Sequence, residues 1–150
     1  MAVNYKPADT QDVIPYLVVP DGEKELEFLK ATFNAKEMHV SRRPDGAIAH
    51  ADLKVGDCTL MMGQGNEQWP PLPAGIYVYV RDVDATYKRA LSAGATSMMP
   101  PADQFYGDRN CGVKDANGVT WWIGTHVEDV PAEELNRRAE EASKKAAQSV

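Results

Sequence analysis

Hydrophobic and polar residues follow a pattern along this chain that occurs twice. The first occurrence indicates a strand, a helix and three strands, over Val13–Val19, about Glu23–Phe33, Met38–Arg43, Ala47–Lys54 and Asp57–Met62. The second indicates the same order, over Ile76–Val80, a helix from the N-cap Asp82 through Ala93, Ala95–Met98, Asn110–Lys114 and Val119–Thr125. The pattern therefore predicts an α+β fold built from two βαβββ units, residues 13–62 and 76–125.

The segments outside the units are also clear from the pattern. Residues 63–75 are predicted as a linker, because three prolines and two glycines within Gly63–Ala74 interrupt any regular element. Pro100-Pro101 indicates a loop within the second unit, and Gly94 is expected to end its helix in a left-handed conformation. We expect residues 1–130 to form a single domain and residues 131–150 to add a C-terminal surface helix.

Composition narrows the function classes. The chain has 150 residues and a formal net charge of −6, which argues against nucleic acid or anionic membrane as a partner. An acidic surface of this kind tolerates a cationic ligand. The isolated cysteines Cys58 and Cys111 and a polar N-terminus predict reduced thiols and a cytoplasmic location. No apolar run approaches about 18 residues, so no membrane span is expected.

Several short motifs stand in a recognisable order. They are IPYLVV at Ile14–Val19, HADLKVGDCTLMM at His50–Met62, VRDVDATYKRALSAGA at Val80–Ala95, and YGDR followed by WWI and TH within Tyr106–His126. Together they resemble the vicinal oxygen chelate superfamily of glyoxalases, bleomycin-resistance proteins and dioxygenases, and its PhnB-like branch in particular. The resemblance implies a barrel in which two units enclose a cavity. Those units come from one chain or from both chains of a homodimer.

The resemblance also implies where a divalent metal ion would be held. The corresponding positions carry Ile14, Met61, Gly75 and Trp122. None of these side chains is a suitable ligand for a hard or borderline cation, so we expect no metal and no other cofactor. We therefore assign no catalytic residue. The alternative is a metal-dependent lyase, isomerase or dioxygenase whose metal site has been rebuilt from other residues.

The first predicted hairpin gathers two histidines. A turn centred on Asp45-Gly46 sets a register that aligns Arg43 with Ile48, Ser41 with His50, and His39 with Asp52. This register places Glu37 and Arg43 on the same polar face as the histidines. A His39–Asp52 pair beside His50 can act as a general base or bind a polar ligand. The same residues equally describe a solvated ladder of cross-strand pairs.

Aromatic residues give a second candidate site. Alternation along the strands places Tyr16, Tyr77, Tyr79, Trp122 and His126 on the cavity side. Such a lining suits a flat aromatic or cationic organic molecule. The alternative is that the rings simply fill the barrel. In addition, Trp69 in the linker can act as a lid. Arg109 either binds an anionic group or pairs with Asp108 or a backbone carbonyl. These patterns favour a metal-free small-molecule-binding protein.

Overall fold

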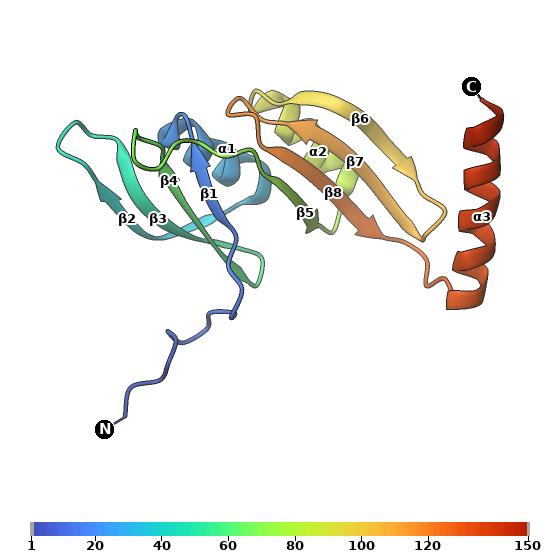
Figure 1. Cartoon of the computed structure of the whole chain (residues 1–150), viewed down its shortest axis with the longest axis horizontal. Helices are drawn as coiled ribbons and strands as arrows, with labels where there is room; N and C mark the ends of the chain where they lie inside the picture. The colour runs from blue at the N-terminus through green and yellow to red at the C-terminus, as the bar shows by residue number, and fades with distance from the viewer. Residues whose placement is uncertain (1, 150) are drawn as a thin grey trace.

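The computed structural model describes residues 2–149 as two βαβββ units followed by a helix (Figure 1). The first unit contains β1 (Tyr16–Val19), α1 (Gly22–Phe33), β2 (Lys36–Arg42), β3 (Ile48–Val55) and β4 (Cys58–Gln64). The second contains β5 (Gly75–Tyr79), α2 (Val83–Ser92), β6 (Thr96–Asp103), β7 (Asp108–Lys114) and β8 (Thr120–His126), and α3 (Ala132–Gln148) follows. The predicted α+β fold and its internal repeat are confirmed.

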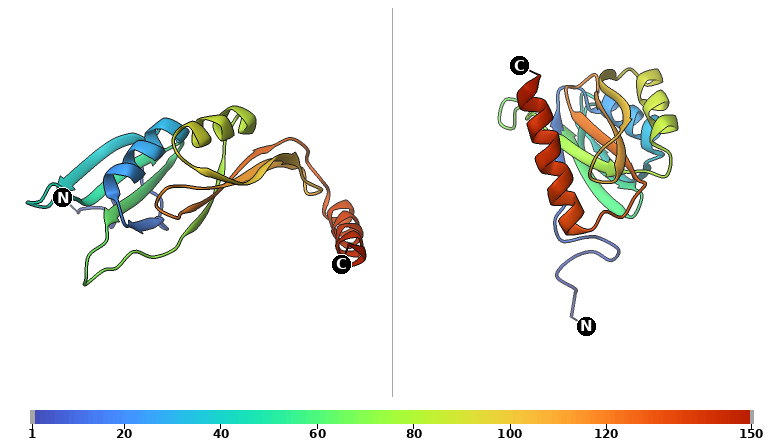
Figure 2. Two further views of the ribbon diagram at one scale, coloured as in Figure 1. Left: turned by 90° about the horizontal axis from the view of Figure 1, so that it is seen from above. Right: turned by 90° about the vertical axis from the view of Figure 1, so that its right-hand side faces the viewer.

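Both units have the same strand topology. The strand orders are β1-β4-β3-β2 and β5-β8-β7-β6, with the first strand of each unit parallel to its last strand. The two sheets share no ladder within residues 2–149. Helices α1 and α2 lie on one side of the sheets, and the other side is left uncovered (Figure 2). We call that uncovered side of each sheet its open face.

One hydrophobic core joins the two units. Trp121 in β8 points toward the helices and is 0% exposed, whereas its neighbour Trp122 points to the open face. The Trp121 ring packs against Phe28 and Phe33 of α1, with ring centroids 6.1 Å and 5.1 Å apart. A side chain from the second unit therefore fills the core of the first, which fixes how the units sit together.

Two predicted helix ends are present. The Asp82 side chain accepts a hydrogen bond from the Ala85 amide at 3.0 Å and so caps α2. Gly94, with φ of 99°, follows the end of the same helix in the left-handed region. These local signals were sufficient to place the second helix from sequence.

The first residue of β1 and the length of β6 differ from the prediction. β1 begins at Tyr16, and Val13 is 85% exposed outside the sheet. β6 continues through Pro100 and Pro101, where the sequence indicated a loop. β6 is the outer strand of its sheet, and its register with β7 shifts between Met99 and Ala102. An edge strand tolerates proline because one side of its backbone has no ladder to complete.

The β2–β3 hairpin keeps part of the predicted register. Ser41 lies opposite His50, and His39 lies opposite Asp52, as predicted. The expected Arg43–Ile48 pair is wrong, because Arg42 takes that place and Ala49 forms a bulge. The bulge turns Ile48 toward α1, where it is 0% exposed.

A second bulge changes the polar face of β2. Glu37 lies opposite Leu53 and His39 lies opposite Asp52, so that Met38 is the extra residue between them. Glu37 therefore leaves the histidine face, contrary to the prediction, and forms an ion pair with Lys30 of α1. Period-two counting fails at bulges because each one reverses the alternation beyond it.

The C-terminal helix α3 stands beside the end of the second unit (Figure 1). None of its described residues is buried. Its Arg138 donates to the Glu128 carboxylate at 2.8 Å and to the Phe105 carbonyl at 3.1 Å, which holds its first half to the domain. No helix within residues 2–149 is long and apolar enough to cross a membrane.

The shared core gives the first test. We expect Trp121→Ala to lower the free energy of unfolding by about 3–5 kcal/mol, because it empties a buried site between the units. Urea denaturation measures this loss. Trp69→Ala is the control, since Trp69 is 67% exposed and should change stability by no more than about 0.5 kcal/mol. Equal effects of the two substitutions would contradict this description of the core.

Candidate functional site

The open face of the second sheet carries four of the predicted site residues. Tyr77 and Tyr79 come from β5, and Trp122 and His126 come from β8, with Tyr77 opposite Trp122 in the parallel ladder. The three aromatic side chains remain accessible, since Tyr77, Tyr79 and Trp122 are 40%, 63% and 36% exposed. The structure therefore brings these residues together on one surface, as alternation along the strands required.

A buried carboxylate organises this surface. Asp108 of β7 is 4% exposed and lies opposite His126. Its Oδ2 accepts hydrogen bonds from the Tyr77 and Tyr79 hydroxyls at 2.7 Å and 2.8 Å. Its Oδ1 lies 2.9 Å from Nδ1 of His126. From the sequence, Asp108 was expected only to pair with Arg109. The register of the β7–β8 hairpin, counted back from the turn, was the signal that could have placed it here.

Two further residues that sequence reasoning missed extend the network. Asn110 is 3% exposed, and its Nδ2 donates to the Tyr106 hydroxyl at 2.6 Å and toward the Tyr77 hydroxyl at 3.3 Å. Its Oδ1 is buried without a hydrogen-bond partner in the described part of the chain. Because Tyr106 accepts from Asn110, its own hydroxyl proton is free to donate outward.

Two glycines make room for the aromatic side chains. A Cβ placed on Gly112 would lie 2.5 Å from the Trp122 ring, and one on Gly124 would collide with the Tyr77 hydroxyl. Any larger residue would displace the rings, so close approach explains glycine at both positions. The Trp122 ring thus packs closely on Gly112 of β7.

The ionisation of this network follows from its hydrogen bonds. Burial alone would raise the pKa of Asp108, but hydrogen bonds from His126, Tyr77 and Tyr79 outweigh it and hold that pKa below its ordinary value. Burial first, and then Asp108, raises the pKa of Tyr77, while Asp108 is the main cause of the raised pKa of Tyr79. At neutral pH the carboxylate is therefore ionised and both hydroxyls stay protonated.

His126 lies between two carboxylates. Besides Asp108, the exposed Asp129 lies 2.8 Å from its Nε2. Asp108 first and Asp129 second raise the pKa of His126 above its usual 6.5. The protonated imidazole satisfies both acceptors, but two carboxylates against one imidazolium leave a net negative charge at this end of the open face.

Arg109 lies apart from this group. Its side chain points to the opposite side of β7 from Asp108 and pairs with Asp84 of α2, through Nε at 2.8 Å and Nη2 at 2.9 Å. Its Nη1 also lies 3.2 Å from Asp103. The guanidinium is thus engaged by two carboxylates and joins α2 to the sheet.

The open face of the first sheet carries a separate group. His50 lies between the Tyr16 hydroxyl, 3.0 Å from Nδ1, and the Asp52 carboxylate, 3.2 Å from Nε2. His39 is exposed on the outer strand opposite Asp52. If Nε2 donates to Asp52, Nδ1 is the acceptor for the Tyr16 proton, and the three groups form a chain. No hydrogen bond joins this chain to the Asp108 network within residues 2–149.

A pocket of about 330 Å³ adjoins the Tyr16 end of this chain. Its wall includes Gly63 of β4, Asn66 and Trp69 of the linker, and the bulged Ala49. Trp69, 67% exposed, borders the pocket without closing it. The predicted role of Trp69 as a lid therefore stays a prediction.

The positions implied for a metal ion do not fit one. Met61 lies opposite Tyr16, Gly75 opposite Thr120, and Trp122 opposite Tyr77, while Ile14 precedes β1. A thioether, an indole and two residues without polar side-chain atoms are poor donors for a hard or borderline cation. Within residues 2–149, no group of three or more His, Cys, Asp or Glu side chains is arranged to hold a metal ion.

Comparison with known proteins identifies the family of this chain. Residues 11–123 match the glyoxalase/bleomycin resistance protein/dioxygenase superfamily. The chain belongs to this superfamily. It is 35% identical over 146 residues to an uncharacterized protein of Mycobacterium bovis, covering 90% of this chain and 93% of that protein.

Solved structures show the same fold. TioX from Micromonospora sp. ML1 is similar with a TM-score of 0.67 and 25% identity, over 78% of this chain and 99% of TioX. The PhnB protein from Bacillus cereus, described as a putative 3-demethylubiquinone-9 3-methyltransferase, has a TM-score of 0.62 and 19% identity. That similarity covers 77% of this chain and 99% of the PhnB protein.

The Asp108 network can be tested by titration. We expect NMR to show a pKa of His126 above 6.5 that falls in Asp108→Asn, where an uncharged oxygen replaces the carboxylate. Because the folded-state pKa is raised, the stabilising contribution of His126 is fully present below pH 6.5 and is lost as pH rises through the raised value. Asp129→Asn should lower the pKa of His126 less than Asp108→Asn does. An unchanged pKa in Asp108→Asn would contradict the network.

Proposed function

We propose that this chain is a metal-free binding protein for a small flat aromatic or cationic organic molecule. The open face of the second sheet is its binding surface. One observation carries the proposal, namely that Asp108 holds the hydroxyl protons of both Tyr77 and Tyr79. The remaining lone pairs of these hydroxyl oxygens are acceptors for a ligand, and the exposed rings supply π faces. A buried anion beneath aromatic rings favours a cation above them.

The family resemblance supports a binding role of the bleomycin-resistance type. Within the superfamily, we place the chain near the PhnB-like branch because of its motifs. The residues at the implied metal positions are unsuited to a metal-dependent mechanism, so binding without chemistry is the simpler reading of this site. The unpaired thiols of Cys58 and Cys111 fit a reducing compartment such as the cytoplasm.

A flat aromatic cation tests the binding surface. We expect N-methylquinolinium to bind more tightly than neutral quinoline in isothermal titration calorimetry, because only the former gains from Asp108 and cation–π contact. Trp122→Ala should weaken binding of the cation about tenfold, in line with a lost cation–π contact of about 1–2 kcal/mol. The Trp122→Ala variant should keep its fold, since the Trp122 side chain is 36% exposed.

The matched control for this experiment is Tyr5→Ala, which removes an 86% exposed ring in the N-terminal segment. Equal affinity for both probes, or equal loss in both variants, would overturn the assignment of the surface. Metal content of protein purified without an affinity tag completes the test. A stoichiometric metal ion would instead support the alternative of a metal-dependent lyase, isomerase or dioxygenase.

We further propose that the chain is a homodimer in which a second copy covers the open faces. Tyr16, Tyr77 and Tyr79 leave a large aromatic area uncovered in the single chain. The rings of Tyr77 and Tyr79, with centroids 5.0 Å apart, form an exposed aromatic group of the kind that marks an interaction site. Unpaired sheet edges give a second reason for association. The cavity that the superfamily fold implies would then form between copies.

Sedimentation velocity at micromolar concentration measures the assembly. We expect a dimer, because burial of the open faces removes apolar surface from water. A chain ending at Val130 is the control, since it lacks α3 but keeps both sheets. It should remain dimeric if association occurs through the sheets. A monomeric full-length chain would contradict the proposal.

A further inference from the structure

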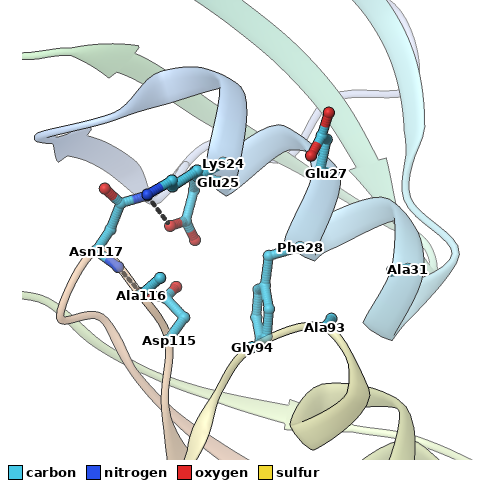
Figure 3. A pocket seen from close by; sticks show the side chains of 10 residues that line it. All are labelled: Lys24, Glu25, Glu27, Phe28, Ala31, Ala93, Gly94, Asp115, Ala116 and Asn117. Carbon is cyan, nitrogen blue, oxygen red and sulfur yellow. Dashed lines mark hydrogen bonds between the residues drawn. The ribbon is translucent and has the colours of Figure 1, made fainter.

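Two carboxyl groups meet in the contact between the units. A pocket of about 390 Å³ lies where α1 of the first unit approaches the β7–β8 turn of the second (Figure 3). Glu25 from α1 and Asp115 from the turn both line it. They are 0% and 6% exposed, so neither is solvated as a surface carboxylate would be. Two buried negative charges side by side are unfavourable, which raises the question of their protonation.

Asp115 has the environment of an ionised carboxylate. Its Oδ1 accepts hydrogen bonds from the amides of Asn117 and Val119 at 2.9 Å and 3.0 Å. Its Oδ2 accepts from Nε1 of Trp121 at 2.8 Å. Three donors stabilise the charged form of this group. A neutral Asp115 would weaken the bond to the Trp121 indole within the shared core.

Glu25 has the opposite environment. Its Oε2 accepts a hydrogen bond from Nδ2 of Asn117 at 3.0 Å, but its Oε1 is buried and has no partner in the described part of the chain. An unpaired buried acceptor is costly, and a proton on Oε1 would convert it into a donor. Burial first, and the adjacent Asp115 second, raise the pKa of Glu25 to about 9.

We propose that Glu25 is a neutral carboxylic acid that donates a hydrogen bond to ionised Asp115, so that the chain binds one proton at the junction of its units when it folds. Asn117 completes the contact, because its side chain accepts from the Asp21 amide at 2.9 Å and donates to the Asp21 carbonyl at 2.8 Å. The proton therefore belongs to a hydrogen-bonded cluster that connects α1 with the β7–β8 turn.

The surrounding charges leave this assignment unchanged. Lys24 and Glu27 of α1 line the same pocket, and Asp21 caps the helix nearby. The α2–β6 turn contributes only Ala93 and Gly94, which carry no charge. Burial and Asp115 raise the pKa of Glu25 by more than the hydrogen bond from Asn117, the remaining polar neighbour, lowers it.

The proton on Glu25 makes the stability of the folded chain depend on pH. In the unfolded chain Glu25 loses its proton near pH 4.5, whereas in the folded chain it keeps the proton to a much higher pH. The folded state thus binds more protons between these values, and stability must fall as pH rises. The contribution is fully present below pH 4.5 and is lost as pH rises through the folded-state pKa.

Glu25→Gln tests the shared proton. The glutamine amide can donate to Asp115 while its oxygen accepts from Asn117, so this variant reproduces the protonated side chain and should fold. Urea unfolding between pH 5 and pH 9 gives the folding equilibrium constant. We expect the wild-type constant to fall more steeply than that of Glu25→Gln, by up to tenfold per pH unit, as one bound proton requires.

Glu27→Gln is the matched control, since Glu27 lies on the same helix and is exposed. It should keep the wild-type slope. Infrared spectroscopy of the wild-type chain in D₂O at pH 7 gives a second readout that does not depend on a variant. We expect the carbonyl band of a protonated carboxylic acid. Absence of this band, or equal slopes in Glu25→Gln and wild type, would overturn the proposal.

Discussion

The contact of Trp121 with α1 is the interaction on which the rest of the structure depends. Its ring packs against Phe28 and Phe33 of the first unit, and its N–H donates to Asp115 in the second. Because side chains alternate along β8, fixing this ring in the core also fixes Trp122 on the open face. The packing of the units and the orientation of the candidate site are therefore set by the same strand.

The repeat produced two open faces with different chemistry on one topology. In the first unit an imidazole, His50, is held between a phenol and a carboxylate. In the second, the carboxylate of Asp108 is at the centre, with two phenols and His126 around it. The first arrangement holds an imidazole between a hydroxyl and a carboxylate, and the second surrounds a buried carboxylate with hydrogen-bond donors. Identical folds thus leave function to a few side chains at equivalent strands.

The sequence predicted most of the fold because its signals are local. Helix caps such as Asp82, and alternation along β5 and β8, depend on nearest neighbours. The alternation also placed Tyr77, Tyr79, Trp122 and His126 on one surface. It grouped Tyr16 with them, whereas the structure places Tyr16 on the open face of the first sheet beside His50. Alternation alone did not show Asp108, whose role depends on the register between β7 and β8. Nor could it show Glu25, which lies 90 residues from its partner Asp115 in the chain and becomes unusual only once both are buried.

The prolines of β6 have a consequence for how copies of this chain can meet. Pro100 and Pro101 lack amide hydrogens, and they lie in the outermost strand of the second sheet. A strand from another molecule cannot continue the ladder past them, so this edge is protected against open-ended addition of strands. Proline in an edge strand is a general defence against amyloid-like growth. Aggregation resistance is thus built into the edge where the sequence alone suggested a loop.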